Sequence, residues 1–104
     1  MENLKYSKFN RMFLAGKDKG NLDQELEHLL ISVKVLYKGY MVDIDNMDKE
    51  DLQYDYLEHK NHYENVLRPF LMKKDILMDK KLCEKANEIS KLYEEFLDTL
   101  AKRL

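Results

Sequence analysis

Glycine and proline are scarce in this chain of 104 residues, which has three glycines and one proline. Folds built on glycine-rich phosphate loops or on many tight turns need more of these residues, so we exclude a Rossmann-like fold and a β-sandwich. The single cysteine, Cys83, excludes an internal disulfide and a cysteine-rich zinc site. No apolar run reaches the roughly 20 residues that a membrane-spanning helix needs. We therefore expect one domain with no membrane partner.

The N-terminal residues 1–6 lack the apolar core of a secretory signal peptide. Together with the lone cysteine, this favours a cytoplasmic location. Lysine outnumbers arginine 15 to 3, and tyrosine, asparagine and leucine are abundant. We interpret this bias as that of an AT-rich genome, such as that of a low-GC bacterium or its phage.

Apolar residues recur at alternating steps of four and three in three stretches, which is the spacing of one face of a helix. Asn21, Asp48 and either Asp75 or Asp79 precede these stretches and suit the N-cap position. The three faces consist of Leu22, Leu26, Leu29, Val33, Leu36 and Tyr40, then of Leu52, Tyr56, His59, Tyr63, Val66 and Phe70, and then of Leu82, Ala86, Ile89, Tyr93, Phe96 and Leu100.

These faces predict an all-α fold, an antiparallel three-helix bundle over residues 21–104. A short basic amphipathic helix and a glycine-flanked hinge are expected at 1–20. We expect Gly39 to end the first helix of the bundle, and Pro69 to kink the second helix or to start a new one. The alternative is an α+β fold with a hairpin at 31–45, because this stretch is rich in β-branched and aromatic residues.

Two pairs of residues, Glu25 with His28 and Glu58 with His62, have the helical spacing of metal ligands. Glu25, Glu58 and His62 fall outside the apolar faces, so we expect them to face solvent. No nucleophile lies beside a base in a recognisable motif. The sequence therefore predicts no catalytic residues, no metal and no cofactor.

Aromatic side chains are the strongest functional signal, since the chain has seven tyrosines and four phenylalanines. Tyrosine suits protein interfaces because it offers apolar contact and a hydroxyl group. The predicted partner-binding residues are Phe9, Met12, Phe13, Tyr37, Tyr40, Tyr54, Tyr56 and His59. In addition, the stretch 29–42 is apolar on nearly every side, which predicts a homodimer.

We expect a small non-enzymatic protein that binds another protein, in the form of an inhibitor, an immunity protein or a regulatory factor. The alternative is a nucleic-acid-associated accessory protein, because basic residues cluster near the second turn of the bundle and in the N-terminal arm. A third hypothesis is a metal-dependent helical-bundle enzyme. The net charge of −2 gives no overall field that favours nucleic acid.

Overall fold

The structure, a computed structural model, describes residues 22–104, and every regular element in that range is helical. The elements are α2 (Leu22–Asp43), the 3₁₀ turn η2 (Ile44–Asn46), α3 (Lys49–His62), the π-helical turn η3 (Tyr63–Leu67), α4 (Arg68–Leu71), α5 (Lys74–Leu77) and α6 (Lys80–Lys102). The prediction of an all-α bundle is confirmed. The helix and hinge predicted at 1–20 lie outside the described residues.

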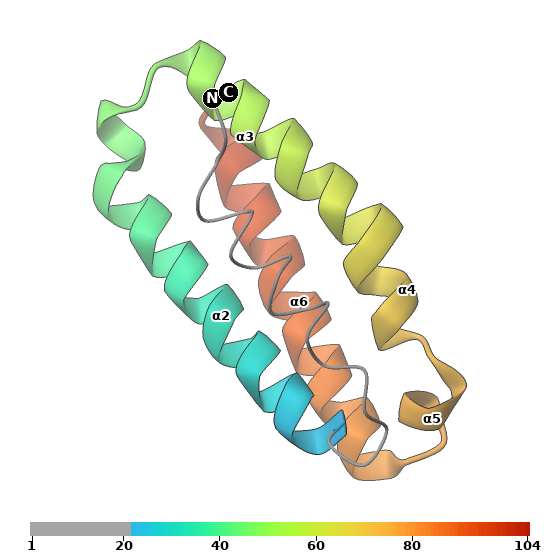
Figure 1. The fold of residues 1–104 in the computed structure, drawn as a ribbon. Coiled ribbons are helices and arrows are strands. Elements are labelled where there is room, and N and C mark those ends of the chain that lie inside the picture. The colour runs from blue at the N-terminus through green and yellow to red at the C-terminus, as the bar shows by residue number, and fades with distance from the viewer. Residues whose placement is uncertain (1–21) are drawn as a thin grey trace.

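The bundle has three long arms: α2, the arm formed by α3, η3 and α4, and α6. Helix α6 packs against both of the others, as Figure 1 shows. Helix α2 runs antiparallel to the arm formed by α3, η3 and α4, and η2 joins the two arms at one end of the molecule. The apolar faces predicted for α2 and α6 are buried between the helices, with Leu22 and Leu82 half-buried at the rim. Burial of these faces supplies the main driving force for folding.

Helix α2 continues four residues beyond Gly39, so the prediction that it ends there is wrong. The alternative hairpin at 31–45 is also wrong, because 31–43 belongs to this one helix. Gly39, the single glycine in the described range, has a negative φ. Tyr40 and Ile44 are buried on the same face, and this burial outweighs the helix-ending tendency of the glycine.

The helical conformation at Gly39 leads to a stability prediction. We expect Gly39→Ala to raise the free energy of unfolding by about 0.5–1 kcal/mol, because alanine loses less backbone entropy in a helix. Urea denaturation followed by circular dichroism measures the change. A fall in stability would contradict a helix that continues through this residue, since alanine is penalised where φ is positive.

The second arm, formed by α3, η3 and α4, contains a π-helical turn at η3. This turn shifts the predicted apolar face by one residue. Beyond Tyr63, the buried residue is Leu67, and Val66 is half-exposed. The prediction of Val66 as a core residue is therefore wrong. Pro69 lies at the start of α4, one turn later. Proline has no N–H to donate to the preceding turn, and a wider turn at this point accommodates that loss.

Helix α6 begins at a side-chain cap, as predicted. The Asp79 carboxylate accepts hydrogen bonds from the backbone N–H groups of Lys81 and Leu82, at 2.9 and 3.1 Å. Asp48 takes the N-cap position of α3 without a side-chain hydrogen bond. Of the two candidates for the last N-cap, Asp79 is the one that starts α6, and Asp75 lies in the short α5.

Candidate interaction surface and buried histidine

Helix α2 exposes an apolar stripe on the side that faces away from the bundle. Ile31, Val35 and Val42 are 51, 64 and 78% exposed. They recur at the spacing of a helical face, directly opposite the buried face of α2. β-Branched side chains hold few rotamers, so this stripe presents a stiff apolar surface. The prediction that 29–42 has more apolar sides than the bundle covers agrees with this exposure.

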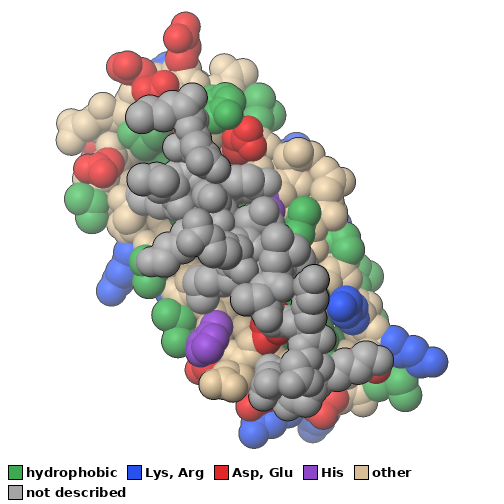
Figure 2. All heavy atoms as spheres, in the orientation of Figure 1, with side chains coloured by type: hydrophobic (Ala, Val, Ile, Leu, Met, Phe, Trp, Pro, Cys, Tyr) green, Lys and Arg blue, Asp and Glu red, His purple; other side chains and the backbone are tan. Residues whose placement is uncertain are grey.

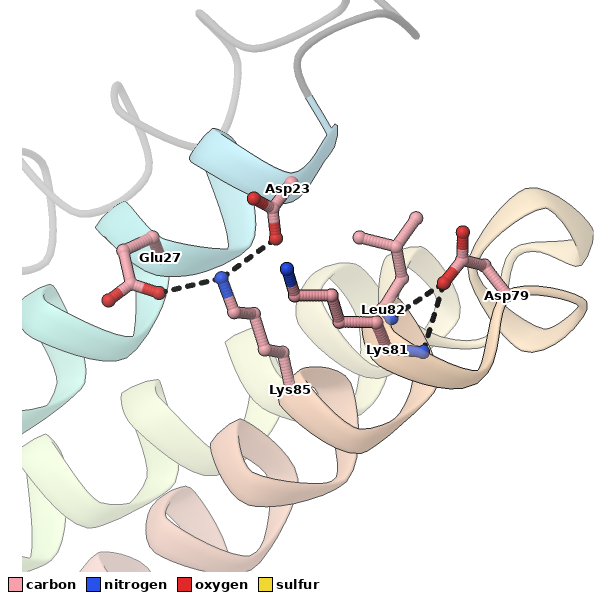
Figure 3. A network of polar contacts seen from close by, with 6 residues as sticks. All are labelled: Asp23, Glu27, Asp79, Lys81, Leu82 and Lys85. Atoms are coloured by element: carbon pink, nitrogen blue, oxygen red, sulfur yellow. Dashed lines mark hydrogen bonds and ion pairs between the residues drawn. The ribbon is translucent and has the colours of Figure 1, made fainter.

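Charges along α2 change sign from one half to the other. Asp23 and Glu27 lie in the N-terminal half, and Lys34 and Lys38 lie in the C-terminal half. The amine of Lys85 on α6 bridges Asp23 at 2.7 Å and Glu27 at 2.8 Å, as Figure 3 shows. Acidic residues near a helix N-terminus are also favoured by the helix dipole.

The Lys85 bridge shifts the pKa values of the groups it joins. The hydrogen bond from Lys85 lowers the pKa of Asp23, and the hydrogen bonds to Asp23 and Glu27 raise the pKa of Lys85. Exposed ion pairs of this kind stabilise a fold little, because water screens them. The main effect of this bridge is to fix the N-terminal half of α2 beside the start of α6.

The two turns of the bundle carry opposite charge. Between residues 43 and 58, at the α2–α3 end, there are seven acidic side chains and one basic side chain. Between 68 and 81, at the α4–α6 end, there are five basic side chains and two acidic ones. Figure 2 shows acidic side chains at both ends of the visible face, and most of the visible basic ones toward the second end. The molecule is 42 Å long, and the acidic N-terminal half of α2, with Asp23 and Glu27, lies at the same end as the second of these segments.

His59 lies in the middle of the bundle, bound on both ring nitrogens. Its Nε2 is 3.2 Å from the Tyr40 hydroxyl, and its Nδ1 is 3.3 Å from the Tyr93 hydroxyl. The Tyr40 hydroxyl donates to the Asp55 carboxylate at 2.6 Å, so its oxygen accepts from Nε2–H. The Tyr93 hydroxyl also lies within reach of the His59 backbone carbonyl, at 3.4 Å. This arrangement satisfies the histidine inside the core.

Of the predicted partner-binding residues, Tyr40 and His59 are buried inside the bundle and contact each other. Tyr37 and Tyr56 are half-buried, and the Tyr37 hydroxyl lies 2.8 Å from the Thr99 hydroxyl. Only Tyr54 among the five described residues is exposed; a hydrogen bond to Glu58 raises its pKa. Phe9, Met12 and Phe13 lie outside the described residues. The tyrosines therefore belong mainly to the core, and the apolar surface of α2 comes from aliphatic residues.

Two polar residues expected in solvent, Glu25 and His62, are buried; Glu58 is half-exposed. Burial lowers the pKa of His62 to about 4 and raises the pKa of Glu25. Within the described range, neither carboxylate oxygen of Glu25 has a hydrogen-bond partner. The expectation of solvent exposure is wrong for both residues because the buried side of each helix is wider than its apolar face: it includes Glu25 beside Leu29, and His62 beside His59.

A shallow hollow of about 300 Å³ lies between the second arm and α6, lined by side chains that include Tyr56, Tyr63 and Leu97. The Tyr63 hydroxyl donates to Glu94 at 2.8 Å and contacts Ser90. Charges of both signs surround the hollow, which gives it no clear ligand preference. In the part of the chain that the structure describes, no three His, Cys, Asp or Glu side chains converge on a metal position.

No family model, curated protein or solved structure matches this chain. Among residues 22–104, no helix is both long and apolar enough to cross a lipid bilayer.

Proposed function

We propose that this is a small non-enzymatic protein that binds another protein through the outer face of α2. The observation that supports the proposal is the exposed stripe of Ile31, Val35 and Val42. Exposed apolar patches on small proteins mark interaction sites, because covering them removes apolar surface from water. We propose that it acts in the cytoplasm as an inhibitor, an immunity protein or a regulatory factor of a low-GC bacterium or its phage.

The proposal predicts that one charge on the stripe abolishes partner binding. We expect Val35→Glu to fold normally, because glutamate is a good helix former at this exposed position. In affinity purification from cells of the source organism, the unmodified chain should retain one protein in stoichiometric amount. The variant should lose that protein, with at least a tenfold fall in recovery.

Leu57→Glu provides the matched control, because Leu57 on α3 is 54% exposed and lies away from the stripe. It should retain the same protein as the unmodified chain. Equal losses in both variants, or equal retention in both, would contradict a role for α2. A tagged copy should be purified beside an untagged copy, so that self-association is detected in the same experiment.

A nucleic-acid-associated accessory protein is the second candidate function. Five basic side chains, Arg68, Lys73, Lys74, Lys80 and Lys81, are exposed at the α4–α6 end. Lysines at this density bind phosphates mainly through charge. Binding to duplex DNA that falls steeply with salt, and that survives Val35→Glu, would favour this function over the first.

A further inference from the structure

We infer that the outer face of α2 is covered by a second copy of this chain, with the two α2 helices antiparallel in a two-fold dimer. This inference rests on the proposed function, because it names the partner of the same surface. A two-fold interface closes on itself, since each copy offers the same surface to the other. Two features of the structure support the second copy and its direction.

The first feature is the spacing of the residues on the outer face. These residues follow one another at steps of four and three: Gln24, His28, Ile31, Val35, Lys38 and Val42. The series reads the same in both directions, so an antiparallel copy matches it position by position. The matching places Ile31 opposite the partner's Val35, and Val35 opposite the partner's Ile31. Ile31 and Val35 of the two copies then meet at the centre, as in an antiparallel helix pair, and Val42 lies opposite the partner's Gln24 at each end.

The second feature is the charge beside the stripe. Glu27, Lys34 and Lys38 flank it on the same side. In a parallel two-fold pair, these residues would face the other side of the partner's stripe, where the uncharged Ser32 and Gly39 lie, so they would form no ion pairs there. In the antiparallel register, Glu27 lies beside the partner's Lys38, and opposite charges meet twice in the dimer. Opposite charges at a helix interface set the orientation of the partner more than they set its affinity.

Disulfide trapping tests the register directly. In a Cys83→Ser background, Ile31→Cys and Val35→Cys proteins are prepared separately, mixed in equal amounts and oxidised in a glutathione buffer. A disulfide forms only where the two Cα atoms approach to within about 7 Å. The antiparallel register places the thiol introduced at position 31 next to the thiol at position 35 of the other copy, whereas identical positions lie more than one helical turn apart along the pair. We expect nearly all cross-linked product to be the mixed disulfide, as measured by mass spectrometry.

Other outcomes overturn the inference. Random collisions would give mixed disulfide in about half of the cross-linked product, and parallel pairing would give same-site disulfides alone. Both positions are exposed, so both variants should keep the circular dichroism spectrum of the unmodified chain. If cross-linking is random and Val35→Glu still loses a different protein in affinity purification, the second copy is wrong and the proposed function stands.

Discussion

Phe96→Ala is expected to lower the free energy of unfolding by about 3–5 kcal/mol, the range for truncating a buried phenylalanine. Phe96 is fully buried on α6. Its ring lies 5.4 Å from the rings of Tyr40 and His59 and 5.7 Å from those of Tyr37 and Tyr93, measured between centroids. Truncation removes contacts with α2 and α3, and with Tyr93 of the same helix, and leaves a cavity between the helices.

Domains of this size are stable by about 5–15 kcal/mol, so the loss is a large part of the total. Urea denaturation of the purified variant measures it. The control is Phe96→Leu, which keeps most of the volume and should cost about 1.5 kcal/mol or less. If Phe96→Ala cost no more than Phe96→Leu, the aromatic cluster would not be the centre of the core.

Acidification is expected to destabilise the fold through His62. Burial holds its pKa at about 4, against an ordinary value of 6.5. Above pH 6.5 the histidine is neutral in the folded and unfolded states alike and has no effect. Below pH 6.5 the unfolded chain takes up a proton that the folded chain excludes, so stability falls with decreasing pH. The loss reaches roughly 3 kcal/mol near pH 4, at about 1.4 kcal/mol for each unit of pKa difference.

The effect of His62 is isolated by comparing variants between pH 7 and pH 4.5. His62→Leu should lose less stability over this range than the unmodified chain, because it has no buried imidazole to protonate. His28→Gln is the control, because His28 is exposed on α2 and glutamine keeps that surface polar. Identical pH dependence in the unmodified chain and in His62→Leu would show that His62 is accessible to protons in the folded state.

The helical architecture could be predicted from the sequence because its signal is periodic and apolar. Leu26, Val33 and Phe96 recur at helical spacing, and the structure buries all three. The π-helical turn could not be predicted, since one extra residue in a turn leaves no mark in composition. Gly39 favoured a helix end by its local preference, and the burial of Tyr40 and Ile44, which depends on the assembled bundle, outweighed that preference.

The candidate surface could be predicted only in part. The apolar stretch 29–42 indicated more apolar sides than one bundle covers, but the direction of the core decides which residues stay exposed. That direction leaves Ile31, Val35 and Val42 at the surface and places Tyr40 inside with His59. Burial of Glu25 and His62 was missed because helical periodicity locates apolar residues and says little about polar residues at the edge of a face.

Sedimentation equilibrium tests most directly whether the outer face of α2 is an interface between copies. A single helix pair is a small interface, so we expect a dissociation constant on the order of 10 μM. At about 100 μM, the unmodified chain should have close to twice its chain mass of 12.6 kDa, and Val35→Glu should have the chain mass itself. A mass of 12.6 kDa for the unmodified chain at that concentration would contradict the dimer.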